Sequence, residues 1–388
     1  MSVLQFKKAN CKNCYKCVRN CPVKAIKIEN QQAQIIAEEC ILCGNCITVC
    51  PQNAKEVRSD VDRVKEMLKE GEVYASVAPS FIASYSVDSF ETFSESLIKL
   101  GFVGAFETAT GAFLTKTQYE KELDNNPQGI LISTCCPTVV SLVQKYYPKA
   151  VPFLSPTLSP MQAHAKFIKK EHPNAKVVFL GPCISKKAEC EELPELCDAV
   201  LTFDELNGWF DAKNIHFDDT KVAESNAYRS RFFPVSGGII KSMNIRADVS
   251  YLSVDGLSGC LDTLDEVCAG RLSNCFIEMS ACEGSCVGGH ATGIDAPHKI
   301  KARMRVEKLA FSKDQADFDI APDVDMNRKI YIDRTVKQIP PEEEIIKILK
   351  KMGKHTIDDE LNCGTCGYST CREKAAAVYF GKADITMI

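Results

Sequence analysis

The first 51 residues contain the same cysteine pattern twice. Cysteines spaced Cys-x2-Cys-x2-Cys-x3-Cys and followed by proline occur at 11–22 and again at 40–51. This spacing wraps a tight loop around one metal centre, and the proline ends the turn. Disulfide scaffolds also hold many cysteines, but they are usually short secreted chains. This chain has 388 residues and 21 cysteines, and its first residues form no apolar leader, so the pattern predicts metal binding.

The repeat resembles the cysteine run of bacterial two-cluster ferredoxins, in which the fourth cysteine of each run binds the other cluster. The resemblance implies two 4Fe–4S cubanes with electron relay as their role, and the alternative is a pair of zinc sites. The first cubane would be held by Cys11, Cys14, Cys17 and Cys50, and the second by Cys40, Cys43, Cys46 and Cys21.

Composition narrows the class of protein. Apolar residues make up 45% and charged residues 25% of the chain, as is ordinary for a globular protein. The net charge of −4 gives no reason to expect nucleic acid or an anionic membrane surface as a partner. The sequence has no apolar run long enough to span a bilayer, so we expect a cytoplasmic protein.

The chain divides into three zones. Residues 1–57 hold the repeat. Residues 58–338 alternate short apolar runs, at 72–78, 129–132 and 176–180, with helical patterns at 61–69, 138–147 and 161–171. This alternation predicts an α/β domain with parallel sheets and crossover helices. Residues 339–388 begin with a helical pattern that ends at Gly353 and continue into a last cysteine group, which predicts a small helical module.

Three patches in the middle zone carry further cysteines. Cys135 and Cys136 precede Pro137 after a predicted strand, which predicts two thiols at a helix N-terminus, where thiolate is favoured. Cys183 follows the next predicted strand within Gly181-Pro182-Cys183. Cys282 and Cys286 are spaced to share one helix face. Each patch alone fits buried structural thiols, which is also what we expect of Cys190, Cys197, Cys260, Cys268 and Cys275.

Together and in this order, the patches resemble the three H-cluster signatures of FeFe hydrogenases, and Phe106–Ala112 and Ser236–Ile240 agree with that family. The resemblance covers about residues 1–310. It implies an α/β H-cluster domain with two parallel-sheet lobes, an N-terminal α+β domain of bacterial-ferredoxin type, and a small helical C-terminal iron–sulfur module.

The resemblance also implies roles by position. Cys136, Cys183, Cys282 and Cys286 match the thiolates of the catalytic 4Fe–4S cubane, and Cys286 would bridge to a diiron subsite carrying CO, cyanide and a dithiolate amine. Cys135 matches the thiol that exchanges protons with that amine, and Lys186 the lysine that pairs with one cyanide. The remaining cofactor-binding positions are Ala78, Pro79, Ser80, Gly181, Pro182, Gly237, Gly238, Met279, Ser280, Gly288 and Gly289. Separate maturases would supply the diiron piece.

Some positions depart from the family pattern. Gly181 and Ser280 stand where the family places methionines, which predicts a roomier and more polar pocket. Ser155 matches the serine of the family's proton path. Tyr119 stands at the place of its first glutamate, and Glu122, with Glu120 as a competitor, at that of the second. The missing glutamate predicts slow proton delivery and low turnover.

The last cysteine group, Cys363, Cys366 and Cys371, resembles a small 4Fe–4S module whose fourth cysteine would stand near Ile388; the alternative is a zinc knuckle. This domain order looks like that of the sensory hydrogenases. The partners it implies are H2 and protons, a ferredoxin-like electron carrier or a signalling kinase or phosphatase, the maturases, and a second copy of the chain. The alternative function is electron transfer or cluster assembly by a hydrogenase-like protein without the diiron site.

Overall fold

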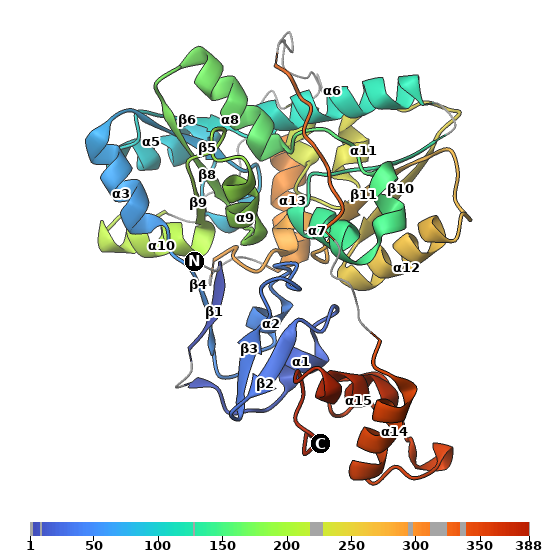
Figure 1. Cartoon of the computed structure of the whole chain (residues 1–388). Coiled ribbons are helices and arrows are strands. Elements are labelled where there is room, and N and C mark those ends of the chain that lie inside the picture. The colour runs from blue at the N-terminus through green and yellow to red at the C-terminus, as the bar shows by residue number, and fades with distance from the viewer. Residues whose placement is uncertain are drawn as a thin grey trace. The chain divides into compact units, whose positions relative to one another are not determined.

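The computed structural model describes residues 3–7, 10–126, 129–217, 228–293, 298–310, 324–333 and 339–387. The chain forms two compact units, one made of Met1–Arg58 with Arg334–Ile388, and the other of Ser59–Asp333 (Figure 1). Sequence ends that lie far apart along the chain therefore fold together in one unit.

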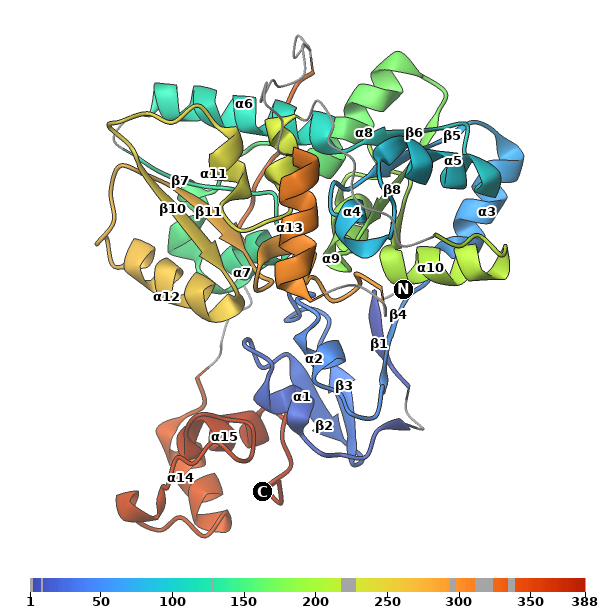
Figure 2. The same ribbon diagram turned by 180° about the vertical axis from the view of Figure 1, so that it is seen from behind.

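The larger unit has two lobes, each built on a parallel sheet (Figures 1 and 2). The first sheet has strand order β6-β5-β8-β9, with β5 at Val73–Val77, β6 at Gly104–Glu107, β8 at Lys176–Gly181 and β9 at Ala199–Thr202. Every residue of β5 is buried, as expected for a strand covered by helices on both faces. Helices α3 (Val61–Glu70), α5 (Phe90–Leu100), α8 (Pro160–Glu171) and α10 (Phe203–Ala212) surround this sheet.

The second sheet has strand order β10-β11-β7, with β10 at Ser250–Asp255, β11 at Cys275–Ser280 and β7 at Ile130–Ile132. Helices α7 (Pro137–Tyr146) and α12 (Leu257–Cys268) lie beside it, with α11 at Gly238–Ser242. Helix α6 (Ala109–Asn125) packs against α8 of the first lobe and α11 of the second. Helix α13 (Lys299–Ala310) lies between the lobes in both views and contacts α4 (Phe81–Ser84).

The smaller unit combines two antiparallel strand pairs with short helices. Strand β1 (Leu4–Phe6) pairs with β4 (Lys55–Val57), and β2 (Ile26–Glu29) pairs with β3 (Gln32–Ile35). Helices α1 (Lys16–Arg19) and α2 (Asn45–Thr48) follow the cysteine loops, while α14 (Glu342–Lys351) and α15 (Cys371–Tyr379) pack together through apolar side chains. The Ile28 amide donates to the Lys382 carbonyl at 2.9 Å, which joins the C-terminal segment to β2.

The predicted α/β class with parallel sheets is confirmed. Predicted strands and helices at 72–78, 129–132, 176–180, 61–69, 138–147 and 161–171 correspond to β5, β7, β8, α3, α7 and α8. The helix expected to carry both Cys282 and Cys286 is wrong: Cys282 lies in a turn, and only Cys286 lies in a short 3-10 helix, η4 (Ser285–Gly288). Gly284 and Ser285 adopt left-handed φ values of 83° and 64°, which an α-helix cannot contain. No helix in the described ranges is long and apolar enough to cross a membrane.

Candidate functional site

The first cysteine run closes around one cavity with a cysteine from the second run. Cys11, Cys14, Cys17 and Cys50 all line this cavity. Asn13 and Tyr15 between them have left-handed φ values of 51° and 58°, which coil the loop tightly. The Ala54 amide donates to the Cys50 sulfur at 3.4 Å, a contact that stabilises a cluster-bound thiolate. The grouping matches the exchange of fourth ligands between the two runs.

The second group brings Cys21 to Cys40, Cys43 and Cys46. Burial, followed by the negative charge of Cys21 and Cys40, raises the pKa of the Cys43 thiol to about 12, so these sulfurs lie close together. The Leu42 amide donates to the Cys40 sulfur at 3.4 Å, and the Ala25 amide to the Cys21 sulfur at 3.3 Å.

Across the described residues, no group of three or more Cys, His, Asp or Glu side chains is placed so as to hold a single metal ion. Each thiolate of a cubane binds a different iron, so separated thiols in one pocket suit a cluster.

The C-terminal cysteine loop packs on α1 of the same unit. The Arg19 guanidinium donates to the carbonyl of Cys14 at 3.0 Å and to the carbonyl of Thr365 at 3.1 Å. The ammonium of Lys24 lies 6.0 Å from the centre of the Tyr368 ring. Cys366 and Cys371 are half-buried and Cys363 is exposed. The loop that would hold a third cluster thus contacts the helix that carries Cys17 of the first cysteine group.

In the larger unit, the remaining candidate thiols follow the carboxyl ends of parallel strands. Cys136 follows β7 and is the N-cap residue of α7, with Pro137 in its first turn. Cys183 follows β8 and precedes α9 (Ser185–Glu192), while Cys282 follows β11. Carboxyl ends of parallel strands lie at one edge of a sheet, which is where ligands bind in open α/β folds. The predicted placement of Cys135 and Cys136 at a helix N-terminus is confirmed.

These thiols influence one another electrostatically. Burial, followed by the negative charges of Cys183 and Cys136, raises the pKa of the Cys286 thiol to about 12. The Cys286 side chain is exposed in this structure. Cys260 on α12, expected only as a buried structural thiol, is fully buried, and burial, followed by the negative charge of Cys136, raises its pKa to about 12. No spacing pattern along the chain indicates this neighbour.

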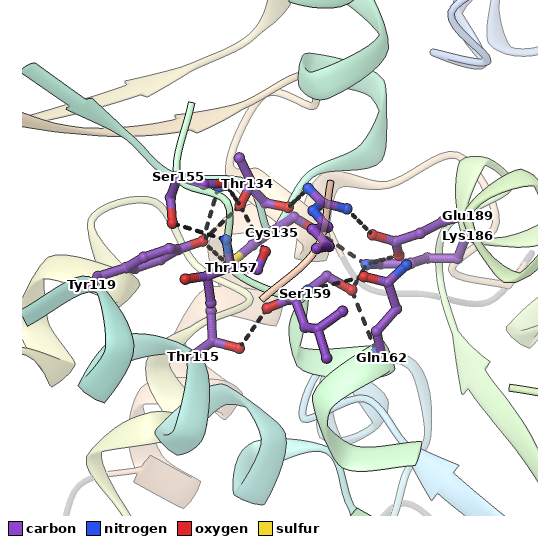
Figure 3. Close-up of polar contacts among 12 residues, drawn as sticks. Thr115, Tyr119, Thr134, Cys135, Ser155, Thr157, Ser159, Gln162, Lys186 and Glu189 are labelled. Atoms are coloured by element: carbon purple, nitrogen blue, oxygen red, sulfur yellow. Dashed lines mark hydrogen bonds and ion pairs between the residues drawn. The ribbon is translucent and has the colours of Figure 1, made fainter. Parts of the chain in front are cut away.

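Lys186 on α9 is buried and all three of its ammonium hydrogens have acceptors (Figure 3). Its Nζ lies 2.5 Å from Glu189 Oε2, 3.1 Å from Ser159 Oγ and 3.2 Å from the carbonyl of Cys135. Burial opposes the charged form, but Glu189 outweighs it and raises the pKa of Lys186, so the group is an ammonium at neutral pH. The lysine predicted from the second patch therefore reaches the backbone of the first.

Tyr119 on α6 contacts Cys135 directly (Figure 3). Its phenolic oxygen lies 3.3 Å from the Cys135 sulfur and accepts a hydrogen bond from the Thr134 amide at 2.8 Å. Burial raises the pKa of Tyr119 well above its usual value, so the phenol keeps its proton. Burial raises the pKa of Cys135 to about 12, which the Tyr119 hydroxyl and the Lys186 charge only partly oppose.

Glu122 and Ser155 lie together on the far side of Thr134. Thr157 Oγ1 donates to Glu122 Oε1 at 2.5 Å, and the Thr157 amide donates to Ser155 Oγ at 3.2 Å. The Thr134 hydroxyl, however, points at the carbonyls of Ser155 and Thr157 at 3.1 and 3.2 Å. A carbonyl carries no transferable proton, so these contacts do not complete a hydroxyl relay to Cys135. The competitor Glu120 accepts instead from the Asn244 amide at 2.7 Å.

The family follows from one comparison. The family model described as "Iron only hydrogenase large subunit, C-terminal domain" matches residues 71–290, which is more than half of the chain. The chain belongs to this family. Models for a 4Fe–4S dicluster domain and for an Fe–S cluster match residues 4–58 and 359–387 of this hydrogenase-family chain.

The relatives of this hydrogenase-family chain include hydrogenases and cluster assembly factors. Iron hydrogenase 1 of Clostridium pasteurianum is 27% identical over an alignment covering 74% of this chain and 64% of the relative. The cytosolic Fe–S cluster assembly factor NAR1 of Yarrowia lipolytica is 24% identical, covering 52% of this chain and 49% of the relative. The chain thus spans less than two thirds of the length of these relatives. A solved FeFe hydrogenase, HydA1 from Chlamydomonas reinhardtii, shares the fold, with TM-score 0.50, 18% identity, and coverage of 66% of this chain and 90% of that one.

The donor groups at the hydrogenase-family site fit an anionic acceptor ligand. Ser80 Oγ, three residues beyond β5, and Gln162 Nε2 on α8 are buried atoms without a hydrogen-bond partner among the described residues. Buried polar atoms are normally paired. Both groups can donate a hydrogen bond, which a cyanide ligand would accept. Ser80 is also one of the cyanide-contacting residues that the resemblance implies. The cubane would be held by Cys136, Cys183, Cys282 and Cys286, and the ammonium of Lys186 would be a further donor at this site.

The two positions that depart from the family behave differently. A Cβ on Gly181 would lie 2.6 Å from a ring carbon of Phe179, so the phenyl ring fills the space that the glycine leaves. The prediction of a roomier pocket at Gly181 is therefore wrong. Ser280 does make the site more polar, because its hydroxyl lies 3.0 Å from that of Ser285. The backbone amides of Gly237 and Gly238 donate to the buried carboxyl group of Glu278.

Proposed function

We propose that this chain is a low-turnover FeFe hydrogenase that interconverts H2 with protons and electrons and reports H2 or redox state to a partner. The observation that carries the proposal is the pair of buried donors at Ser80 and Gln162 that lack a hydrogen-bond partner within the described residues, together with thiols that follow the ends of β7, β8 and β11. A structural thiol group would not need either feature.

When bound, the diiron subsite of the H-cluster would supply the open iron site at which H2 is made or split. The chain's own residues hold and orient that group. Cys136, Cys183, Cys282 and Cys286 would anchor the cubane, and Cys286 the bridge to the diiron subsite. Pro79, Ser80 and Lys186 would hold the cyanides, and Cys135 would move a proton at its sulfur.

Low turnover follows from the proton side of the site. Glu122, Ser155 and Thr157 form one polar group, and Thr134, Tyr119 and Cys135 form another. The carbonyls of Ser155 and Thr157 lie between them, and Tyr119 holds its proton too strongly to relay one readily. Protons would therefore reach Cys135 more slowly than along a chain of carboxylates and hydroxyls.

The smaller unit would carry electrons. Two ferredoxin-type clusters would exchange electrons with the catalytic domain. The C-terminal loop, which contacts α1 through Arg19, would hold a third cluster in the same unit. Cys363 is exposed, so a partner could exchange electrons there. We propose a ferredoxin-like carrier or a signalling kinase or phosphatase as that partner, maturases as the source of the diiron piece, and the cytoplasm as the compartment.

A second function, cluster assembly without the diiron subsite, is favoured by one observation. All three ammonium hydrogens of Lys186 are directed to protein acceptors, so the chain satisfies this lysine by itself. The similarity to NAR1 assembly factors points in the same direction.

Infrared spectroscopy of protein produced with diiron-site maturases separates the two. We expect CO and cyanide bands in the wild-type protein, and their loss in Cys286→Ser. The matched control is Cys275→Ser, which alters a buried thiol on β11 and should keep the bands. Iron analysis showing cubanes without any CO or cyanide bands would establish the assembly-type function. Film electrochemistry showing high turnover would contradict the low-turnover part.

A further inference from the structure

Arg328 enters the catalytic site from a segment that the family model does not cover. The family match ends at residue 290, and Arg328 lies beyond α13 in the described stretch 324–333. The backbone of this stretch runs beside residues 156–158. The Leu158 amide donates to the Met326 carbonyl at 2.7 Å, and the Arg328 amide to the Pro156 carbonyl at 2.7 Å. Main-chain bonds on both sides therefore fix where the Arg328 side chain begins.

The Arg328 side chain is only 6% exposed and makes two contacts in the site. One nitrogen donates to the carbonyl of Thr134 at 3.2 Å, next to Cys135 in the chain. Another lies 3.4 Å from Glu189 Oε1. The other oxygen of the same carboxylate, Oε2, holds Lys186 at 2.5 Å. Glu189, 1% exposed, is thus shared between two buried cations.

The charges explain what this sharing does. Lys186 and Arg328 carry two positive charges, and Glu189 is the carboxylate that both of them contact directly. Glu192, on the same helix, interacts with all three residues electrostatically. For Lys186 to bind any ligand, it must turn at least one hydrogen away from its present acceptors. A buried carboxylate that loses its partner is costly, and Arg328 keeps Glu189 paired when Lys186 turns.

We propose that Arg328 is a positioning residue with two roles. Through Glu189 it determines how far the Lys186 ammonium can extend toward a ligand, and through the Thr134 carbonyl it holds the Thr134–Cys135 loop in place. The Lys186 part rests on the proposed hydrogenase function, whereas the loop part does not. The planar fork of arginine suits the task, because it contacts a carboxylate and a carbonyl at the same time, which a lysine ammonium does less well.

The experiment compares full-length wild type with Arg328→Gln, Arg328→Lys and the control Lys329→Gln, whose side chain is exposed in the neighbouring position. Hydrogen exchange of residues 133–136 is measured in protein without the diiron subsite. We expect exchange to rise about tenfold in Arg328→Gln, since a hydrogen bond from a charged group contributes on that order, to be partly restored in Arg328→Lys, and to be unchanged in Lys329→Gln.

Infrared spectra of the same variants, produced with maturases, test the second part. We expect the cyanide bands to shift in Arg328→Gln and in Glu189→Gln but not in Lys329→Gln. Unchanged exchange together with unchanged bands in Arg328→Gln would overturn the proposal. If the wild type itself lacks the bands, the hydrogenase function fails while the exchange data still decide the role of Arg328. If Arg328→Gln does not fold, Arg328→Lys and Glu189→Gln supply the comparison.

Discussion

The phenolic oxygen of Tyr119 lies 3.3 Å from the sulfur of Cys135, and the Thr134 amide fixes that oxygen at 2.8 Å. Because the phenolic oxygen accepts this hydrogen bond from the amide, its own hydrogen can be donated to the Cys135 sulfur or to the Thr134 hydroxyl, which lies 3.4 Å away. A hydrogen bond from the phenol to the sulfur favours the thiolate of Cys135. Among the described residues, the hydrogen bonds of the Tyr119 hydroxyl go to Thr134 and Cys135 and not to Glu122.

Removing this donor should affect both turnover and stability. In Tyr119→Phe we expect turnover to fall about tenfold, the factor for one hydrogen bond of about 1.4 kcal/mol. The buried Thr134 amide also loses its acceptor, which should lower the free energy of unfolding by about 1–3 kcal/mol. The measurements are H2 evolution and a thermal midpoint. Tyr85→Phe is the matched control, since Tyr85 is buried in the other sheet's core and donates to the Phe203 carbonyl. Equal turnover losses in both variants would show that Tyr119 acts only through packing.

Glu278 should make stability depend on pH. Burial raises its pKa from 4.5 to about 7, against the amides of Ile240 and its neighbours that favour the charged form. Because the folded-state pKa of Glu278 lies above its unfolded value, the stabilisation from its protonated form is fully present below pH 4.5. This stabilisation is lost as the pH rises through about 7. Between pH 5 and 8 the wild type should lose about 3 kcal/mol of unfolding free energy relative to Glu278→Gln. Thermal melts across this range measure it. The exposed Glu266→Gln should follow the wild type, and parallel curves for Glu278→Gln would contradict the prediction.

Gly181 should tolerate no side chain while Phe179 keeps its place. In Gly181→Ala the new Cβ would lie 2.6 Å from the Phe179 ring, so we expect a loss of about 1–3 kcal/mol in unfolding free energy. Phe179→Leu in the same chain should recover part of the loss. Gly208→Ala serves as control, because nothing lies within 4 Å of its Cβ and alanine suits the helix α10, so it should stabilise by up to about 1 kcal/mol. A neutral Gly181→Ala would mean that Phe179 moves freely.

Gly367 should be required for the C-terminal loop to dock on α1. It has φ +97°, and a Cβ there would lie 2.9 Å from Val18 Cγ1. Gly367→Ala should therefore speed limited proteolysis of residues 359–387 and lower their iron content. Gly381→Ala shares the left-handed conformation, with φ +66°, but has nothing within 4 Å, so it bears only the conformational cost of about 1–2 kcal/mol. The difference between the two variants isolates the contact with Val18. Equal rates of proteolysis in the two variants would show that the contact with Val18 does not hold the loop in place.

Much of the fold was predictable because it depends on local patterns. Buried parallel strands such as β5 and β8 are continuous apolar runs, and α7 begins where a proline follows two cysteines. The turn at Cys282 was not predictable from the spacing of Cys282 and Cys286, since that spacing fits a helix as well as a turn. Left-handed Gly284 and Ser285 decide between the two, and only the folded backbone shows them.

Spacing also indicated which neighbouring thiols of each run to group, because cysteines two or three residues apart must share a loop. The exchange of Cys21 and Cys50 and the grouping of Cys136, Cys183, Cys282 and Cys286 came from the family resemblances. Spacing could not show that Phe179 fills the space beside Gly181, that Cys260 lies near Cys136, or that Arg328 shares Glu189 with Lys186. Phe179 and Gly181 lie on the same strand, but where the Phe179 ring packs depends on what surrounds β8. The other two relationships join residues from different helices and a late segment, which only the folded chain brings together. The sequence by itself therefore determined the metal-binding class and the family. The tertiary structure decided how Tyr119 meets Cys135, because that contact depends on where α6 packs and not on any pattern along the chain.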